Sequence, residues 1–412
     1  MSMSPPDHLP LPITTDGSDE FAYLTMRGRH PQMLQKVIDA NPNYPETIRE
    51  ELTYLQQSLQ GNVPLSMLNL YPSPPPDYID WATAFYARRS AYGKEGRLMW
   101  WDIDWFFAET YLFRLIIEAV RWWELGSDPF APMKQEELDS RDLWTLLDSA
   151  LQLPGGAYDR LPELLRLATF GNRIDQSYQA SVDQGTTANA ADLLVDDSET
   201  TREHLLQAQL EAFPQPQQGV AHIICDNAGT ELAMDLALTD ALLTGFSDVV
   251  ILHVKYHPTF VSDATAFDVR NTITQAVGGN HGGSTFPAVF GMGRRLQEAL
   301  SGGRLRLAPH LFWNSSRYLW EMPEILQRVF DDAQITILKG DANYRRALGD
   351  AAWHPATPFE EIVSYFPCPL LALRTLKSTP IVGLPPDAAQ RLDSEDREWR
   401  TNAQRGVVQF SR

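Results

Sequence analysis

The C-terminal half of the chain alternates between short apolar runs and helical patterns. The apolar runs, which we interpret as strands, are residues 220–225, 248–254, 305–308, 334–339 and 370–376. After the first run, Leu232, Leu236 and Leu243 recur at helical spacing, so a tight turn leads from this strand directly into a helix. Strands that alternate with helices predict a parallel, doubly wound sheet, a Rossmann-like α/β/α core.

The N-terminal half has helical patterns with little sign of strands. They cover residues 32–40, 44–61, 97–125, 135–150 and 161–169, and an exposed connecting helix is expected within 190–217. The pattern at 97–125 is apolar on nearly every side, which predicts a buried helix whose tryptophans, Trp100, Trp101, Trp105, Trp122 and Trp123, are core residues. Glu109 and Arg114 would then need partners inside the protein, and a structural ion pair is the simplest expectation.

These patterns predict three parts of the chain. Residues 1–20 form a flexible tail that is rich in proline, residues 21–217 a mainly helical region, and residues 218–412 the α/β domain with the functional site. The glycine-rich segment 278–283 is a surface loop or a lid, and its role stays open. A Gly-Asn turn at 171–172, followed by Asp175, is turn and cap chemistry that could also reach a site between the parts.

Composition narrows the class of partner. Lys and Arg number 34 against 53 Asp and Glu, a net charge of −19, which argues against nucleic acid and anionic membranes. No apolar stretch is as long as a membrane span. The two cysteines, Cys225 and Cys368, lie in or beside apolar runs and are expected to be free thiols. We therefore expect a cytoplasmic protein, with the nucleus not excluded.

Acidic and amide side chains follow the first two strands of the α/β pattern. Asp226 and Asn227 come directly after the first strand, and Asp263 follows the loop after the second. Asp and Asn also cap helices, so a structural role for this pair remains an alternative. Two carboxylates and an amide oxygen at one sheet edge are ligands for Mg²⁺ or Mn²⁺. An EF-hand is excluded because its alternating ligands are absent.

Later strands add further polar groups at the same predicted edge. Asp341, Asn343 and Arg345 follow the strand at 334–339, and Lys377 follows the strand at 370–376. A metal ion with nearby cations suits the binding of a phosphoryl group. The sequence has no Walker loop, no Gly-x-Gly-x-x-Gly after a strand and no Gly-x-Ser-x-Gly. His253 and His257 lie on a strand and a loop, which does not favour a zinc pair.

The motifs at these strand ends resemble those of the DUF89 family. They are Asp-Asn-Ala-Gly at 226–229 with Glu231, Phe-Val-Ser-Asp at 260–263, Lys-Gly-Asp-Ala-Asn-Tyr-Arg at 339–345 and Arg-Thr-Leu-Lys at 374–377. The resemblance is to the branch with an Arg-Thr-x-Lys motif, the damage-control phosphatases also described as the acidic-residue methyltransferase 1 group. It implies a Rossmann-like core with a helical N-terminal part, and a metal-dependent phosphatase for small phosphometabolites such as sugar phosphates, for instance fructose 1-phosphate.

The resemblance also implies roles for individual residues. Asp226, Asn227 and Asp263 would hold the metal, Mn²⁺ or Ni²⁺ with Co²⁺ or Mg²⁺ as alternatives, and together with Glu231 would form the catalytic set. The implied substrate-binding residues are Asp226, Asn227, Glu231, Asp341, Asn343, Tyr344, Arg345 and Lys377. The chain departs from the family at Thr230, at 256–259 and at 378–379, beside the expected ligands. These departures bear on the substrate preference rather than on the activity.

Two other functions remain as alternatives. One is an S-adenosylmethionine-dependent carboxyl methyltransferase acting on protein glutamate, as the family's second name implies, although no glycine-rich nucleotide loop accompanies the first strand and methyl transfer needs no metal. The other is a non-catalytic binding protein of the same fold. The expected partner is a small phosphorylated metabolite, without nucleic acid or membrane, and the oligomeric state is open.

Overall fold

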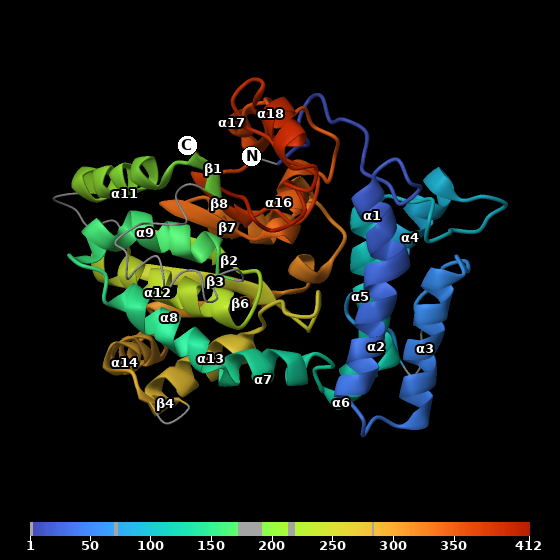
Figure 1. Cartoon of the computed structure of the whole chain (residues 1–412), viewed down its shortest axis with the longest axis horizontal. Helices are drawn as coiled ribbons and strands as arrows, with labels where there is room; N and C mark the ends of the chain where they lie inside the picture. Colours follow the sequence, from blue (N-terminus) through green and yellow to red (C-terminus); the bar gives the residue numbers. More distant parts are fainter. Residues whose placement is uncertain (1–2, 70–72, 172–191, 213–218, 282–283) are drawn as a thin grey trace.

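A mostly parallel sheet lies between two layers of helices, and a separate group of helices stands beside this sandwich (Figure 1). The computed structural model describes residues 3–69, 73–171, 192–212, 219–281 and 284–412. The predicted α/β class is confirmed. The turn expected at 171–175 falls largely outside the described residues.

The main sheet has seven strands in the order β1-β9-β8-β7-β2-β3-β6. Their bounds are β1 Leu193–Asp196, β2 Val220–Ile224, β3 Val249–Lys255, β6 Leu305–His310, β7 Ile335–Lys339, β8 Leu370–Thr375 and β9 Gly406–Ser411. All five predicted strands are present, and β8, β7, β2, β3 and β6 are parallel to their neighbours in that series. The sequence did not predict β1, or β9, which is antiparallel to β8. The two-stranded hairpin β4 (Asn280–His281) and β5 (Ser284–Thr285) lies at the glycine-rich segment.

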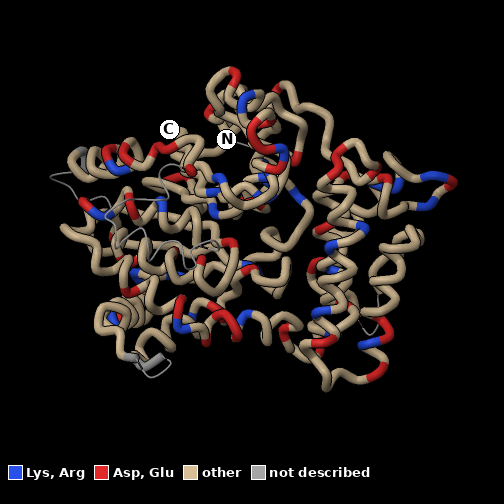
Figure 2. Tube along the Cα trace, viewed as in Figure 1, with Lys and Arg blue, Asp and Glu red and all other residues tan. Residues whose placement is uncertain are grey.

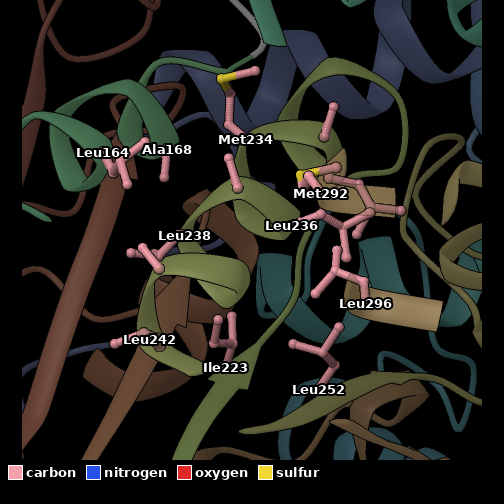
Figure 3. Close-up of a cluster of buried hydrophobic side chains, with 14 of the residues drawn as sticks. Leu164, Ala168, Ile223, Met234, Leu236, Leu238, Leu242, Leu252, Met292 and Leu296 are labelled. Carbon is pink, nitrogen blue, oxygen red and sulfur yellow. The ribbon is translucent and has the colours of Figure 1, made fainter. Parts of the chain in front are cut away.

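One face of the sheet packs on the helix that follows β2. The helices of this layer are α8 (Arg141–Leu151), α9 (Ala157–Thr169), α12 (Thr230–Gly245), α13 (Ala266–Gly278) and α14 (Pro287–Ser301). Leu236 and Leu242 of α12 lie close to Ile223 of β2 and Leu252 of β3, and Leu296 of α14 completes the cluster (Figure 3). Every residue of α12 from Glu231 to Leu243 is buried, so the acidic positions on this helix are inside the protein.

The opposite face packs on shorter helices. They are α15 (Glu324–Gln327), α16 (Asp341–Leu348), α17 (Phe359–Val363) and α18 (Ala388–Glu395), with 3₁₀ turns at Leu311–Asn314, Leu319–Glu321 and Arg328–Phe330. In β7, Leu338 faces this layer while Ile337 faces α12. This alternation is the period of two that a strand covered on both faces requires.

We call residues 20–125 the helical lobe. Its elements are α1 (Glu20–Leu24), a π-helix (Thr25–Arg29), α2 (His30–Ala40), α3 (Glu46–Gln60), α4 (Tyr78–Tyr92), α5 (Trp105–Ala119) and α6 (Trp122–Leu125). The lobe has a hydrophobic core of its own. Helix α7 (Ala131–Asp139) runs from the lobe towards the sheet (Figure 1). Leu143 of α8 and Leu164 of α9 belong to the core of the sheet, so the division between the cores does not coincide with the expected boundary at 217/218.

The N-terminal segment, expected to be a flexible tail, packs against both halves of the molecule. The amide of Ile13 donates to the carbonyl of Asp350, and the amide of Thr15 donates to the carbonyl of Ile103, each at 2.9 Å. The amide of Trp105 donates to the carbonyl of Ile13 at 2.8 Å. These contacts also explain why the helix expected at 97–125 begins only at Trp105: the backbone just before it is bonded to the N-terminal segment.

The same predicted helix also ends early and is less uniformly buried than expected. Arg121 has a φ of 56°, which breaks the helix before α6. Trp100 and Trp105 are buried, whereas Trp101, Trp122 and Trp123 are only half-buried. Glu109 and Arg114 do have ion-pair partners, although not each other: Glu109 pairs with Arg345 at 2.6 Å and Arg114 with Asp77 at 2.6 Å.

Helix α11 (Ser198–Ala212) follows β1, where the sequence predicted only a connecting helix. Both cysteines are free thiols, as expected. Within the described parts of the chain, none of the helices combines the length and the apolar character that crossing a bilayer would require.

A pair of buried histidines on the neighbouring strands β2 and β3 leads to a prediction about acid stability. His222 Nδ1 lies 2.8 Å from His253 Nε2, and burial lowers the pKa of His222 from 6.5 to about 4. Between these two values the unfolded chain binds a proton at His222 that the native protein does not bind. The contribution of His222 to the free energy of unfolding is therefore fully present above pH 6.5, and it is lost as the pH falls towards 4.

We expect the free energy of unfolding to fall between pH 7 and pH 4.5 by about 2 kcal/mol less in His222→Asn than in the parent protein. The exposed His8 is the control, since His8→Asn should leave the pH dependence unchanged. Guanidinium unfolding at the two pH values measures the difference, and equal losses in parent and His222→Asn would contradict the prediction.

Candidate functional site

The carboxyl ends of β8, β7, β2 and β3 adjoin in the sheet, because these parallel strands are consecutive neighbours. The site predicted from the sequence lies at this edge. Asp226 and Asn227 follow β2, and Asp263 ends the loop that follows β3. The amide of Ala264 donates to the carbonyl of Asp226 at 2.7 Å, and the amide of Ala228 donates to the carbonyl of Ser262 at 2.6 Å. The two segments are thereby joined through their backbones.

The Asp226 side chain occupies space that is available only because residue 340 is a glycine. Gly340, at the end of β7, has a φ of 82°, and a Cβ added there would lie 2.0 Å from Asp226 Oδ2. The Asp226 side chain is 5% exposed, yet its Oδ1 has no hydrogen-bond partner among the described residues. A buried carboxylate oxygen without a partner is costly, and a bound ligand would remove that cost.

Asn227 connects three members of the site. Its Nδ2 donates to Asp226 Oδ2 and to Glu231 Oε2, both at 2.9 Å. Its Oδ1 accepts a hydrogen bond from Ser262 Oγ at 2.6 Å. Because these partners orient the amide, its carbonyl oxygen has a defined direction and a remaining lone pair.

Neither Asp226 nor Asn227 caps helix α12 in the described contacts. The amide of Thr230 donates instead to Glu137 Oε1 of α7 at 2.8 Å. Gly229 has a φ of 68°, and a Cβ there would overlap the Glu137 carboxylate. The capping alternative is therefore not supported, and the polar side chains after β2 are available for chemistry.

Asp263 and Glu231 are each held by a buried lysine that the sequence did not single out as functional. Lys255 Nζ lies 3.2 Å from Asp263 Oδ2, and Lys339 Nζ lies 3.0 Å from Glu231 Oε1. Lys339 also contacts Asp235 Oδ1 at 3.0 Å and the carbonyl of Ala168 at 2.5 Å. The sequence signal that could have revealed these two residues is a lysine within an apolar strand, since a buried lysine needs a carboxylate partner.

Lys and Arg residues are scattered over the molecule (Figure 2). An anionic ligand would therefore depend on the few cations that lie next to it at the site. Lys377 follows β8 and is half-buried, and its backbone amide donates to Asp341 Oδ1 at 3.1 Å. Within the described residues, its ammonium group has no hydrogen-bond or ion-pair partner. Its charge opposes the burial that raises the pKa of Asp226 and, after that of Lys339, lowers the pKa of Glu231, so Lys377 lies within electrostatic reach of both carboxylates.

The acids of the site have opposite electrostatic environments. Burial, followed by the charges of Glu231 and Asp263, raises the pKa of Asp226 well above its ordinary value. Burial alone would raise the pKa of Glu231 too, but Lys339 and then Lys377 lower it below its ordinary value. Asp226 therefore lies where a cation is most favourable, while Glu231 already has its counter-charges.

Three residues expected to bind substrate have polar groups that other residues of the protein already engage. Arg345 lies against Trp105 and pairs with Glu109 and Asp350, so its charge is already neutralised by two carboxylates. Tyr344 is fully buried, and its hydroxyl donates to Gln409 at 2.8 Å. Arg345 is thus bound to the helical lobe, and Tyr344 belongs to the core on the opposite face of the sheet from α12.

The third is Asp341, which accepts from Arg374 Nε at 2.8 Å as well as from the Lys377 amide. It fixes the strand end that presents Lys377, and Arg374 is fully buried behind it. Asn343 remains a candidate. Its Nδ2 donates to the carbonyls of Cys225 and Lys339, and its buried Oδ1 has no partner among the described residues.

The donor set fits a hard divalent cation. Asp226 Oδ1 is a buried oxygen without a hydrogen-bond partner among the described residues, whereas the buried Asp263 Oδ2 lies 3.2 Å from Lys255 Nζ. The backbone of Asn227 bridges to that of Asp263. The described residues contain no group of three His, Cys, Asp or Glu side chains suited to a metal. The set is thus two carboxylates and one amide, which leaves positions open for water and substrate.

The comparison with known proteins decides the family. Residues 25–392 match the model of the damage-control phosphatase ARMT1-like domain. The chain belongs to this family. The resemblance inferred from the motifs is confirmed, and the expected enzyme class agrees with the names of the curated relatives.

Those relatives are similar over nearly their whole length. Damage-control phosphatase ARMT1 of Danio rerio is 28% identical over 446 residues, 98% of this chain and 97% of the relative. The proteins of the same name from Xenopus tropicalis and Homo sapiens are 29% and 27% identical, each with at least 97% of both chains covered. A DUF89 family protein from Pyrococcus horikoshii, 13% identical with a TM-score of 0.50, covers 97% of this chain and 99% of its own. It supports the fold.

Proposed function

We propose that this chain is a metal-dependent phosphatase that hydrolyses small phosphometabolites such as sugar phosphates in a damage-control role. The observation that carries the proposal is the buried Asp226 Oδ1, which has no hydrogen-bond partner among the described residues, together with the nearby Asp263 carboxylate and the ammonium group of Lys377, which has no ion-pair partner in the same part of the chain. A cation between the carboxylates and a lysine on the open side form a receptor for one phosphoryl group. The free thiols and the acidic surface suit a cytoplasmic enzyme.

In this proposal Asp226, Asn227 and Asp263 hold the divalent metal, Mn²⁺ or Ni²⁺ with Co²⁺ or Mg²⁺ as alternatives. A metal bound there would polarise a phosphoryl oxygen and orient a water. Lys377 binds a second phosphoryl oxygen, and Asn343 accepts a hydrogen bond from the substrate or its water. Glu231, whose oxygens are held by Lys339 and Asn227, accepts a hydrogen bond from the attacking water or a substrate hydroxyl.

The function is tested by measuring phosphate release from a panel of phosphometabolites. Chelator-treated protein is assayed with sugar phosphates, nucleotides and a generic aryl phosphate, each with Mn²⁺, Ni²⁺, Co²⁺ and Mg²⁺ in turn. We expect release from sugar phosphates that requires added metal. Absence of release under every condition, or methyl transfer from S-adenosylmethionine in its place, would contradict the proposal.

Asp263→Asn and Asp248→Asn form a matched pair for the metal assignment. Asp248 lies before β3, is exposed and accepts from the amide of Gly219 at 3.0 Å, whereas Asp263 is buried beyond the opposite end of the strand. We expect Asp263→Asn to weaken Mn²⁺ binding at least roughly tenfold, because a charged ligand is replaced by a neutral one. Asp248→Asn should bind as the parent does. Calorimetric titration measures both, and equal effects would contradict the assignment.

Glu231→Gln tests the role assigned to that side chain. We expect kcat to fall roughly 10²-fold, the low end of general acid–base contributions, with Mn²⁺ affinity near that of the parent protein. Lys339 is expected to tolerate the change, because Asp235 remains as its ion-pair partner. A parallel loss of metal affinity and kcat would instead make Glu231 a metal ligand.

A further inference from the structure

The loop that carries Asp263 contains a rare backbone conformation. Phe260 and Val261 have φ values of 48° and 68°, although neither is glycine and Val261 is β-branched. The amide of Ser262 donates to the carbonyl of Phe260 at 2.8 Å, which closes a three-residue turn around Val261. A γ-turn with positive φ at its centre is the strained form, and such strain persists only where the surroundings maintain it.

The residues that follow this turn are those that organise the site. Ser262 Oγ donates to Asn227 Oδ1, and the carbonyl of Ser262 accepts from the amide of Ala228, both at 2.6 Å. The next residue is Asp263, whose amide donates to the carbonyl of Thr259 at 3.3 Å. The direction in which the chain leaves Val261 therefore sets the positions of the Ser262 hydroxyl and the Asp263 carboxylate.

The surroundings that maintain the turn come from the helical lobe and from helix α7. The rings of Phe260 and Phe113 of α5 have centroids 4.8 Å apart. Phe113 is buried, and both Phe260 and Val261 pack against the core of the lobe. Lys134 of α7 donates to the carbonyl of Asp263 at 2.9 Å and so holds the far end of the same loop.

We propose that the helical lobe is a positioning element for the metal site: Phe113 holds Phe260, the contact maintains the strained turn at Val261, and the turn aims Ser262 and Asp263 at Asn227. This inference rests on the proposed function, because it concerns the proposed metal ligands. In this proposal Phe260 and Phe113 are positioning residues, which act on the site through Ser262 and Asp263. Metal affinity then depends on a contact with the other half of the molecule.

The test measures Mn²⁺ affinity of the full chain by competition with an indicator dye, alongside Tm in chelator. We expect Phe260→Ala to bind Mn²⁺ roughly tenfold more weakly, which corresponds to about 1.4 kcal/mol. Phe85→Ala is the control. Phe85 is buried in the same core and contacts Tyr86 and Tyr111 rather than the loop, so this variant should lower Tm but keep affinity within about twofold.

A second variant separates strain from lost packing. Glycine adopts a φ of 68° without strain, so adding Val261→Gly to Phe260→Ala should recover at least part of the lost affinity, although it removes a further side chain. If the loop contributed only packing, the double variant would bind Mn²⁺ still more weakly than Phe260→Ala does. Equal affinity in the parent and Phe260→Ala, an equal loss in Phe85→Ala, or no recovery in the double variant would overturn the inference alone. Absence of Mn²⁺ binding by the parent would overturn it together with the proposed function.

Discussion

Asp226→Ala is expected to lower kcat at least about 10³-fold while the protein stays folded. The metal contribution to phosphoryl transfer is worth several kcal/mol. Asp226 is the proposed metal ligand with a buried carboxylate oxygen that has no partner among the described residues. In the absence of metal, Asp226 is a buried acid crowded by Glu231 and Asp263. Its removal should therefore leave the Tm of metal-free protein unchanged or slightly higher, and should abolish the rise in Tm on addition of Mn²⁺.

The control for this prediction is Glu137→Ala. Because Glu137 caps α12, its loss should cost about 1 kcal/mol of stability while phosphatase activity persists. Tm and phosphate release measured on the same samples distinguish the two roles. If Asp226→Ala instead behaves as the cap variant does, losing stability but retaining turnover, the metal assignment is wrong.

Lys377→Met is expected to lower kcat/KM for sugar phosphates by about 10- to 150-fold, because a phosphoryl oxygen loses a charge-assisted partner worth roughly 1.5–3 kcal/mol. The chain carries a net charge of −19, so a phosphorylated substrate depends on local cations. Arg345 is engaged by two carboxylates and Arg374 by Asp341. Lys377 is thus the cation at this edge that lies within electrostatic reach of Asp226 and Glu231 without an ion-pair partner in the described residues.

Methionine keeps the apolar stem of Lys377 and removes only its charge, so the fold should be unaffected. Mn²⁺ affinity should stay constant or rise slightly, since a positive charge near the carboxylates is gone. Lys94→Met, at a lysine that is 68% exposed in the helical lobe, is the control for the change in net charge. Steady-state kinetics with one sugar phosphate measure all three proteins, and unchanged kcat/KM in Lys377→Met would place the phosphate elsewhere.

The sequence was sufficient for the five parallel strands of the sheet and for the acids at their carboxyl ends. Apolar runs covered on both faces are easily recognised, and parallel strands bring their carboxyl ends together whatever the helices between them do. For this reason Asp226, Asn227 and Asp263 could be grouped correctly. Strands β1 and β9, at one end of the sheet, were not predicted, because β9 pairs antiparallel with β8 and its position depends on the rest of the fold.

Side chains on α16 could not be assigned from their spacing alone. Arg345 follows a strand end and looks like a ligand for an anion, yet Glu109 of the helical lobe, 236 residues earlier, pairs with it. Lys339 shows the reverse. It reads as part of a buried strand, and its role appears only when α12 brings Glu231 and Asp235 to it. In both cases a partner from a distant segment decides the direction and the charge state of the side chain.

The most direct test is phosphate release from a sugar phosphate by chelator-treated protein, titrated with Mn²⁺, in the parent and in Asp226→Ala. The account predicts no release without metal, saturable activation of the parent, and no activation of Asp226→Ala at any Mn²⁺ concentration that activates the parent. Release that persists in chelator, or equal activation of Asp226→Ala, would contradict a metal-dependent phosphatase site at the carboxyl end of β2.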